Sequence, residues 1–452
     1  MSALVASPAH GVEDLDAVRA LQHALYRAAK ADPGRRFHAL RDKVLRRDVM
    51  WRAWVQVRRN NGAAGIDRVT LEAVERYGVT RLLDELVTDL KDGNWRPVPA
   101  RRVFIPKPGS AERRPLSIPT VRDRVVQAAL KIVLEPIFEA DFLPCSFGFR
   151  PRRAAHDALQ VLLDESFAGQ LWVVETDIAN CFEAIPHDKL MQAVEERVCD
   201  QAVLKLLRAI LRVGVLADGQ VRRAVTGTPQ GGVVSPLLCN VYLHRLDRAW
   251  RPAYGTLVRF ADDLVVMCRT QGQARAALAR LTALLAGLGL EPKAAKTRIV
   301  HLQVGGEGFD FLGFHHRWVS TRAVRSTRRL TFLARWPSRK AAQHARDRIR
   351  ELTARSQLTV PVEYVVRDVN LFVRGWAGYF RYGNSAESFD KISAYADDRM
   401  CLFVGKRHKR GRRYGQARLI QTGNRFGLIN LNGADVAPRP NRPWRAPVEH
   451  RR

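Results

Sequence analysis

The sequence predicts an α+β fold in which antiparallel hairpins come first and a helical region follows. The polar turn Phe260-Ala261-Asp262-Asp263 lies between the apolar runs 257–258 and 264–267, a pattern typical of strand, tight turn and strand. Beyond about residue 320 the apolar residues recur at helical spacing instead. Hairpins in one part of a chain and helices in another favour the α+β class.

Composition predicts two or three domains and a polyanionic partner. The chain has 452 residues and carries 75 Lys+Arg against 45 Asp+Glu, a formal charge of +30 at pH 7. So much positive charge favours nucleic acid as the partner. An anionic membrane surface is the alternative, but there is no long apolar segment, and the N-terminus, with Glu13, Asp14 and Asp16, lacks a signal-peptide pattern. We therefore expect no membrane partner and a soluble, intracellular protein.

The cysteines predict no metal chemistry. None of the six belongs to a C-x-x-C pair, so structural zinc is not expected. Most lie in apolar stretches, as buried thiols do in a reducing compartment.

The N-terminal part is predicted to be helical up to a basic hairpin. Residues 1–35 are Ala-rich and weakly patterned, as in a frayed helix, and residues 37–57 show helical spacing before the turn-forming residues 60–67. Residues 103–106 and 116–119 have the pattern of short strands around a basic turn. Cations at the tip of such a hairpin suit a triphosphate clamp, although a solvated basic turn is equally common.

The middle of the chain supplies strands and a glycine-rich loop. An apolar run that ends at Asp177 predicts a strand, and a helix-rich stretch follows to about Val213. The loop 226–232 is rich in glycine, which lets backbone approach a ligand closely. The stretch 405–452 is rich in Gly, Pro and Arg and is expected to be partly disordered when free. Helices are predicted for residues 237–246, 272–290, 338–356, 362–382 and 386–404, and a further strand for 309–314.

Asp262 and Asp263 at the tip of a buried hairpin predict a metal site. Two adjacent carboxylates repel each other and resist desolvation unless a cation neutralises them. Asp177, at the end of another apolar run, supplies a third carboxylate. Three such groups could clamp two divalent ions about 3.5–4 Å apart, one activating a primer hydroxyl and the other the leaving pyrophosphate. The pattern therefore indicates nucleotidyl transfer.

Five segments, in order, resemble the reverse transcriptases encoded inside group II introns, the intron maturases. Any one of them could arise by chance, whereas five in the right order and spacing rarely do. The resemblance runs from about Trp54 to about Lys409. The segments are residues 103–108 with 115–120, Ser146-Phe147-Gly148-Phe149-Arg150-Pro151, Asp177-Ile178-Ala179-Asn180-Cys181-Phe182, 229–238 and 260–263.

The resemblance implies a right-hand polymerase with fingers, an antiparallel palm sheet and a helical thumb. Its domains would be an N-terminal helical extension over 1–90, fingers and palm over 91–320, a helical thumb or maturase domain over 321–410 and a basic tail over 411–452. The zinc-bearing endonuclease of many members has paired C-x-x-C motifs, which are absent here. We therefore expect a bacterial-type member that lacks this domain and does not cut the second DNA strand.

The resemblance also assigns catalytic roles. Asp177, Asp262 and Asp263 would hold two Mg²⁺ ions, or Mn²⁺, with the Ile178 carbonyl as a further ligand. Phe182 would close over the sugar and exclude a 2′-hydroxyl, unless it is a plain core aromatic.

Other residues would contact the nucleotide. Gln230 would touch the incoming nucleotide or the template base beneath it, and Lys296 would lie near the nucleotide. Lys107 and Arg114 would hold the triphosphate. The basic turn is one residue longer than in the family, so either Arg113 or Arg114 could be the phosphate ligand.

Tyr395-Ala396-Asp397-Asp398 is the literal signature that reverse transcriptases usually show where this chain has Phe260. Its neighbours predict a helix, so we expect Asp397 and Asp398 on a solvated helix face and not in catalysis. Phenylalanine at position 260 keeps the aromatic ring, and activity should survive the change. The apolar residues at helical spacing are Phe389, Ile392, Met400 and Phe403.

Residues 361–409 resemble the maturase-specific domain that also serves as the polymerase thumb. A helix over 369–380 can pack aromatic side chains in a core while it offers cations and rings to RNA. The cations expected to bind RNA are Arg374, Lys406, Arg407, Lys409, Arg410, Arg412 and Arg413.

The leading hypothesis is an RNA-directed DNA polymerase that binds its own group II intron RNA and assists splicing and mobility. Its partners would be the intron RNA, an RNA template, a DNA primer or target and deoxynucleoside triphosphates, in the bacterial cytoplasm near the nucleoid. Two alternatives stay open: a domesticated reverse transcriptase in defence or repair, and an RNA-binding splicing cofactor with a silent polymerase. The sequence does not reveal which RNA or DNA is bound, whether an intron surrounds the gene, or the oligomeric state.

Overall fold

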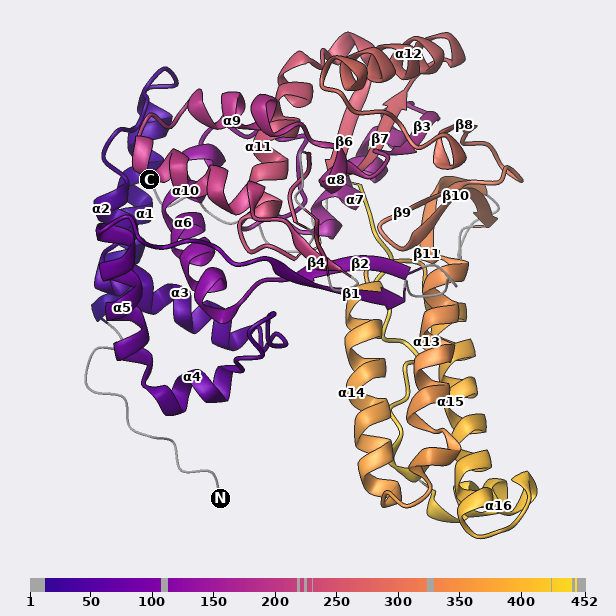
Figure 1. Cartoon of the computed structure of the whole chain (residues 1–452). Helices are drawn as coiled ribbons and strands as arrows, with labels where there is room; N and C mark the ends of the chain where they lie inside the picture. Colours follow the sequence, from indigo (N-terminus) through magenta and orange to yellow (C-terminus); the bar gives the residue numbers. More distant parts are fainter. Residues whose placement is uncertain are drawn as a thin grey trace.

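The computed structural model describes residues 13–106, 113–217, 220–222, 226–229, 231–322, 329–423, 425–440 and 444. Helices from the first part of the chain gather on one side of the molecule, and long helices from the last third stand on the other (Figure 1). A sheet lies between the two groups. Two hydrophobic cores follow this division, and the central sheet contributes side chains to both.

The N-terminal helices form part of the first core. Helix α1 (Glu13–Ala31) packs along α6 (Val121–Glu139). Its apolar side chains recur every three or four residues and are buried, so the expectation of a frayed helix is wrong for these residues. The buried residues are Val18, Leu21, Leu25 and Ala29. The helices between α1 and α6 are α2 (Arg41–Val44), α3 (Arg47–Arg59), α4 (Leu71–Tyr77) and α5 (Val79–Lys91).

The basic hairpin belongs to a four-stranded sheet. Strands β1 (Ala100–Pro106) and β2 (Arg113–Ile118) pair antiparallel, as the sequence predicts, with Val103 opposite Leu116. Two short strands that the sequence analysis did not foresee, β4 (Val215–Ala217) and β5 (Gln220–Arg222), extend the sheet in the order β2-β1-β4-β5. In Figure 1 the hairpin reaches across from the first group of helices toward the second.

The central sheet carries the expected carboxylate hairpin. Its strands are all antiparallel, in the order β6-β7-β3-β8. Side chains alternate between the two faces, so that Leu264 and Val266 of β7 enter the first core while Val265 and Met267 enter the second. The strands are β3 (Trp172–Asp177), β6 (Thr256–Phe260), β7 (Asp263–Cys268) and β8 (Arg298–His301).

Helices surround the central sheet and join its strands. Helices α11 and α12, which the sequence predicts, belong to the first core, and α7 belongs to the second. These elements are α7 (Ala155–Phe167), α8 (Cys181–Ala184), α9 (His187–Glu195), α10 (Gln201–Arg212), α11 (Ser235–Ala249), α12 (Gln271–Gly287) and the 3₁₀ helices η1 (Pro252–Tyr254) and η2 (Ala294–Lys296).

A third sheet replaces the helix expected just after residue 320. Strand β9 (Phe309–Phe311) agrees with the prediction, but β10 (Phe314–Arg322) and β11 (Arg329–Pro337) continue as a long antiparallel pair. The segment 329–337 contains Thr331, Phe332 and Trp336, which are residue types that favour strands. Helical structure begins only at Arg339.

Three long helices then stand together, close to the predicted spans. They are α13 (Arg339–Leu352), α14 (Val362–Phe380) and α15 (Ala386–Arg407), with η3 (Arg355–Gln357) between the first two. Phe380, Phe389 and Phe403 are buried in the second core. On α14, Trp376 is buried beside Phe380 and Tyr379 packs against them, so these aromatic side chains belong to the core, as the sequence suggests.

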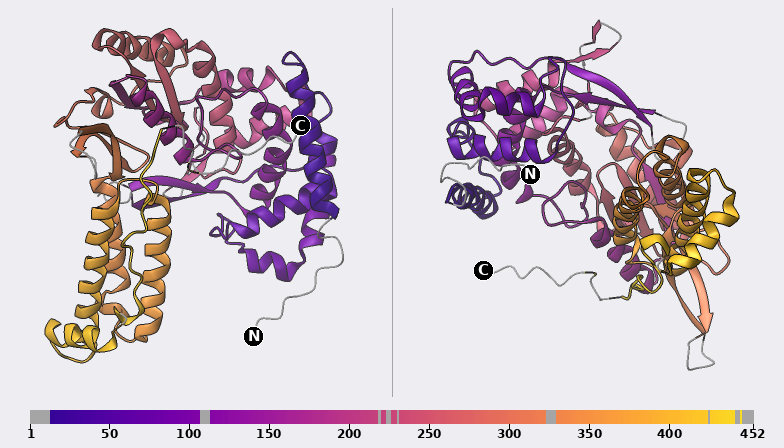
Figure 2. Two further views of the ribbon diagram at one scale, coloured as in Figure 1. Left: turned by 180° about the vertical axis from the view of Figure 1, so that it is seen from behind. Right: turned by 90° about the horizontal axis from the view of Figure 1, so that it is seen from below.

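Partial disorder was expected for the basic stretch after residue 405, and its described residues up to 440 are packed on the rest of the protein. Helix α16 (Arg412–Thr422) packs on α15, and η4 (Arg425–Gly427) follows. Leu428 and Leu431 are buried in the second core, and the Arg439 carbonyl accepts a hydrogen bond of 3.0 Å from Gln160 Nε2 on α7. Figure 2 shows the chain returning along the long helices toward the central sheet. These apolar and polar contacts hold a segment for which disorder was expected.

Candidate active site

Asp177 and Asp263 face each other across two central strands. Asp177 ends β3 and Asp263 begins β7, and the two residues are direct partners in the antiparallel register. Asp262 lies on the turn between β6 and β7, where its carbonyl accepts a 3.0 Å hydrogen bond from the Ile178 amide. Ala261 before it has a φ of 57°, in the left-handed region. The strand register and the turn therefore place the three predicted carboxylates at the same end of the two central strands.

The carboxylates perturb each other's protonation. Burial, a hydrogen bond from Asp263 to Asp177 and repulsion by the nearby carboxylates raise the pKa of Asp263 to about 9. Burial also raises the pKa of Asp177, but the hydrogen bond from Asp263 and the ammonium of Lys296 outweigh it, and the net pKa is lowered. Burial and the charge of Asp177 raise the pKa of Asp262. Without a divalent cation the facing pair thus retains a proton.

The residues fit a divalent cation in the type of donor that they offer. Carboxylate oxygens are the ligands that Mg²⁺ prefers, and a cation would remove the repulsion that keeps Asp263 protonated. Among the residues that the structure describes, however, no group of three or more His, Cys, Asp or Glu is close enough to hold a metal. The direct contact is between Asp177 and Asp263, with Asp262 beside them. The structure therefore supports a two-carboxylate core and does not show a closed three-ligand cluster.

Lys296 lies at the carboxylates. It belongs to η2, and Lys293, the residue just before this helix, donates its amide to the Asp177 carbonyl at 2.7 Å. The Lys296 ammonium forms an ion pair with Asp177 Oδ2. Burial lowers the pKa of Lys296, but Asp177 and the other carboxylates raise it more, and the net pKa is raised. Lys296 therefore supplies positive charge next to the carboxylates, and its expected place near the nucleotide stays a prediction.

Phe182 is held on α8 by the glycine-rich loop. The Thr228 amide donates to the Phe182 carbonyl at 2.6 Å, and the Gly227 amide donates to the Ile185 carbonyl at 2.7 Å. A Cβ on Gly227 would lie 2.7 Å from the Glu183 Cα, so only glycine permits this approach. Phe182 itself is half-buried at the edge of the first core. This partial burial is compatible with both predictions for Phe182, a ring that excludes a 2′-hydroxyl and a plain core aromatic.

A buried guanidinium braces the carboxylate turn. Arg259 and Asp247 are fully buried and form an ion pair with N–O distances of 2.8 and 2.6 Å. Arg259 also donates to the Ala261 carbonyl at 3.1 Å, to Asn240 Oδ1 at 3.0 Å and to Ser146 Oγ at 2.8 Å. All five of its N–H donors are therefore used. One side chain ties the turn before Asp262 to α11 and to the loop at 146.

The sequence analysis missed this brace, although a signal was present. Arg259 is a charged residue that directly follows the apolar residues Leu257 and Val258 in the predicted strand. A charge in such a strand is rarely buried without a partner. The partner, Asp247, lies at the end of the predicted helix 237–246, and the spacing alone does not connect the two.

The predicted triphosphate ligands are only partly described. Lys107 and Gln230 lie outside the described residues. Arg113 and Arg114 are exposed on β2, opposite Pro106 and Ile105 of β1. Neither arginine is distinguished as a phosphate ligand by these positions.

Two of the seven predicted RNA-binding cations are engaged within the protein. Arg407 Nη1 donates to the Leu358 and Val360 carbonyls at 2.6 and 2.5 Å. Arg412 forms an ion pair with Asp398. The others have exposed side chains, on α14, near the end of α15 or at the start of α16: Arg374, Lys406, Lys409, Arg410 and Arg413.

The second Asp-Asp pair lies on a helix and not on the carboxylate hairpin. Asp397 and Asp398 lie within α15, as the sequence predicts. Asp397 binds Arg425 at 2.6 Å, and Asp398 pairs with Arg412. Both carboxylates hold the segment that follows α15, so the expected solvated face is instead a set of ion pairs.

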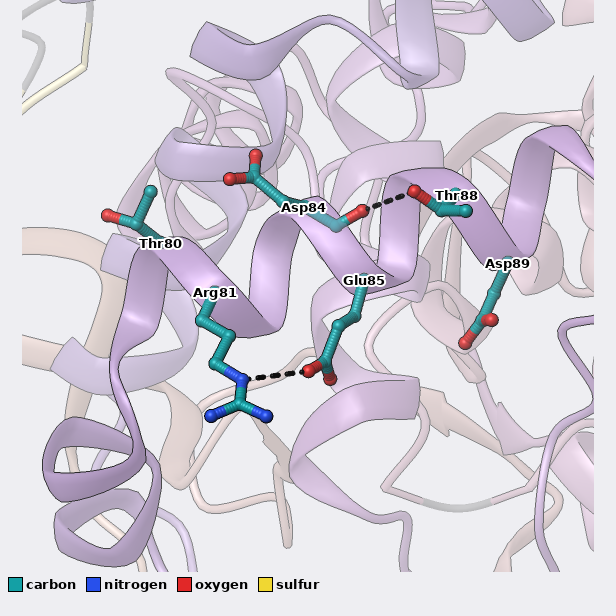
Figure 3. Close-up of a pocket in the computed structure, with 6 residues that line it drawn as sticks. All are labelled: Thr80, Arg81, Asp84, Glu85, Thr88 and Asp89. Atoms are coloured by element: carbon teal, nitrogen blue, oxygen red, sulfur yellow. Dashed lines mark hydrogen bonds and ion pairs between the residues drawn. The ribbon is translucent and has the colours of Figure 1, made fainter.

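The hollow drawn in Figure 3 lies elsewhere, along α5. Its lining includes Arg81 and Glu85, which are ion-paired at 3.2 Å. Arg122 pairs with Glu85 at 3.2 Å and with Asp89 at 2.9 Å. These exposed ion pairs and the nearby Asp84 form a solvated polar surface, which is not the pattern of a catalytic site.

Two parts of the chain match known families. Residues 105–316 match the family described as reverse transcriptase (RNA-dependent DNA polymerase). Residues 342–419 match the group II intron, maturase-specific domain. The first match contains the carboxylate hairpin, and the second contains α14 and α15. Within the described residues, no helix is both long enough and apolar enough to cross a membrane.

Individual relatives agree with these matches. The chain is 36% identical over 302 residues to Protein YkfC of Escherichia coli, which covers 58% of this chain and 76% of that protein. It is 39% identical over 207 residues to the group II intron-encoded protein LtrA of Lactococcus lactis. This match covers 45% of this chain and 34% of LtrA. It is 38% identical over 209 residues to an uncharacterised 91 kDa protein in the cob intron of Schizosaccharomyces pombe, covering 46% and 25%. The chain thus spans most of the first relative and about a third or less of the other two.

The carboxylate hairpin of the central sheet, the helical region behind it and both family matches agree with the resemblance found in the sequence. The chain therefore belongs to the reverse transcriptase family, the RNA-directed DNA polymerases, and carries the maturase-specific domain of group II introns.

Proposed function

We propose that this chain copies RNA into DNA at the Asp177, Asp262 and Asp263 site and binds its group II intron RNA to assist splicing and mobility. The observation that carries the proposal is the facing pair Asp177 and Asp263, with Asp262 on the turn beside them. The substrates would be an RNA template, a DNA primer or target and deoxynucleoside triphosphates. The protein would act in the bacterial cytoplasm near the nucleoid, where its formal charge of +30 would favour binding to nucleic acid.

The protein's own residues would prepare the site for nucleotide addition. Asp177, Asp262 and Asp263 would hold Mg²⁺, with the Ile178 carbonyl as a further ligand. When bound, two such ions would activate the primer hydroxyl and stabilise the leaving pyrophosphate. Lys296 would keep positive charge at the carboxylates before the nucleotide arrives. Arg259 would fix the turn that carries Asp262.

Phe182 would select the sugar. Phe182 lies five residues after Asp177 in the chain, and its backbone is fixed by Thr228 of the glycine-rich loop. A ring held at this place can exclude a 2′-hydroxyl by steric overlap. Lys107, one of the arginines 113 and 114, and Gln230 would complete the nucleotide contacts.

The direct test of polymerisation is primer extension with the purified full chain. We expect a DNA primer annealed to RNA to be extended with deoxynucleotides in the presence of Mg²⁺. Extension should stop when EDTA is added and resume when Mg²⁺ is restored in excess. A folded protein that binds the primer-template and adds no nucleotide with Mg²⁺ or Mn²⁺ would favour the silent splicing cofactor instead.

Phe182→Ala is expected to admit ribonucleotides. Removal of the ring opens space at C2′, so the preference for deoxynucleotides should fall by roughly 10- to 100-fold. The ratio of kcat/KM for dATP to that for ATP, in single-nucleotide extension, measures the change. An unaltered ratio in an active variant would identify Phe182 as a core aromatic.

RNA binding is expected to weaken steeply with salt. Each phosphate contact contributes about 0.7 to 0.9 to the slope of log affinity against log salt. Changing Lys406, Lys409, Arg410 and Arg413 to glutamine should therefore flatten the slope by about 3 units if each binds a phosphate. A filter-binding titration with structured intron RNA measures it.

An equal loss of charge elsewhere is the matched control. Exposed cations outside the long helices, changed to glutamine, should leave most of the slope intact: Arg76, Lys91, Arg275 and Arg280. Equal flattening in both variants would show that binding depends on net charge and not on the end of α15. A truncation after residue 410 is unsuitable, because Leu428 and Leu431 are core residues.

A further inference from the structure

Phe149 is an exposed aromatic residue with a strained backbone. Its side chain is 50% exposed, and its φ is 56°, in the left-handed region. A bulky residue rarely adopts this conformation, and such strain collects at functional sites. The family resemblance rests on the segment that contains Phe149, but gives this ring no role. Its surroundings therefore decide what it can do.

Both neighbours of Phe149 are anchored. A Cβ on Gly148 would lie 2.5 Å from the Ala261 amide nitrogen, so the backbone at 148 sits directly against the carboxylate turn. Asn240 Nδ2 also donates to the Gly148 carbonyl at 2.8 Å. On the other side, buried Arg150 pairs with Glu139 at 2.6 Å. With residues 148 and 150 fixed, the Phe149 side chain is directed outward and cannot relax into the core.

The Phe149 ring contacts Phe182. The ring centroids are 6.4 Å apart with an interplanar angle of 76°, an edge-to-face arrangement. Phe182 is held from its backbone side by the glycine-rich loop. Phe149 thus supports the free side chain of a residue whose main chain is already fixed. Arg259, which binds both Ser146 Oγ and the Ala261 carbonyl, links this support to the carboxylate turn.

We propose that Phe149 is a specificity-determining residue that acts through Phe182, by holding its ring in the position that excludes ribonucleotides. The inference rests on the proposed polymerase function and deepens it. Rejection of one hydroxyl depends on a displacement smaller than the size of that group, so a mobile ring discriminates poorly. A second ring against the first restricts its motion. Phe149 is therefore a positioning residue for Phe182 and not itself a catalytic residue.

The test compares deoxynucleotide with ribonucleotide insertion. Single-nucleotide extension of a DNA primer on an RNA template gives kcat/KM for dATP and for ATP. Phe149→Ala should lower the ratio of the two by about 3- to 10-fold, the range expected for loss of one aromatic pair. Insertion of dATP itself should change less than insertion of ATP. Phe149→Tyr, which keeps the ring, should restore the wild-type ratio.

Two further variants make the test specific. Phe167, at the end of α7, is 49% exposed and provides a matched control, so Phe167→Ala should leave the ratio unchanged. In a Phe182→Ala background, Phe149→Ala should have no additional effect on the ratio, because the ring that it positions is gone. Thermal unfolding of each variant separates a local change from loss of the fold.

The outcomes divide clearly. A folded, active Phe149→Ala variant with an unchanged ratio overturns the inference. An equal fall for dATP and ATP overturns it too, because the ring would then contact the template or the base and not govern the sugar. Additive effects of the two alanine substitutions would also overturn action through Phe182. If the wild-type chain extends with neither nucleotide, the proposed polymerase function fails first, and the inference fails with it.

Discussion

Asp262→Asn is expected to abolish primer extension while the protein stays folded. The side chain is a proposed metal ligand, and its loss should lower kcat/KM by more than about 100-fold, beyond the loss typical of residues that only support a ligand. Burial already raises the pKa of Asp262, so a neutral isostere is compatible with its surroundings. Extension on an RNA template in Mg²⁺, together with circular dichroism, measures both properties.

The second Asp-Asp pair is the matched control for this result. Asp397→Asn with Asp398→Asn removes two adjacent carboxylates from α15, where they bind Arg425 and Arg412. We expect extension to remain within about 2-fold of wild type, since partly exposed ion pairs contribute little to stability. If this pair were essential and Asp262 dispensable, the active site would be misplaced.

The same variant separates splicing from polymerisation. Splicing needs the protein to bind and stabilise folded RNA, so Asp262→Asn should still promote splicing of a reporter with the cognate intron. Neutral changes at Lys406, Lys409, Arg410 and Arg413 should do the reverse. A folded wild-type protein that neither binds nor assists any cognate intron would favour the domesticated polymerase over the maturase.

Asp247→Asn is expected to be the most destabilising single change considered. It leaves the Arg259 guanidinium fully buried without its counter-ion. Loss of one partner of such a pair lowers the free energy of unfolding by about 3–5 kcal/mol. Urea denaturation, followed by circular dichroism, should show an earlier transition for the variant.

Two controls test the reason for this effect. Asp247→Glu keeps a negative charge beside Arg259 and should destabilise less than Asp247→Asn. The exposed pair Arg348 and Glu351 has the same charges on α13. Glu351→Gln should change the free energy of unfolding by at most about 1 kcal/mol. Equal effects at both sites would mean that burial does not determine the contribution of the pair.

The carboxylate hairpin could be predicted because its signal is local. The polar turn with Asp262 and Asp263 interrupts two apolar runs, and strand pairing follows from adjacent segments. The helices α14 and α15 were predictable for the same reason, since their apolar periodicity extends over several turns. The false signature at Asp397 and Asp398 could be assigned to a helix from its neighbours alone.

The elements that were not predicted depend on contacts outside their own residues. Strand β11 is stabilised by pairing with β10, the strand before it, and nothing within residues 329–337 specifies that pairing. A frayed helix was expected at α1, but this helix gains a stable position by packing on α6, more than a hundred residues away. The composition of the segment after residue 405 favours disorder, yet Leu428 and Leu431 are buried in the second core. In each case contacts beyond the segment complete a structure that the local pattern alone does not specify.

The sequence by itself determined the family, the candidate carboxylates and the basic character that favours nucleic acid. Residue types in a fixed order carry that information, because the chemistry requires particular side chains. Only the tertiary structure decided that Asp177 faces Asp263, that Arg259 fastens their turn and that Phe149 contacts Phe182. These relations depend on strand register and on buried contacts between segments far apart in the chain. The order of residues alone specifies neither the strand register nor these buried contacts, because both arise from the geometry of packing.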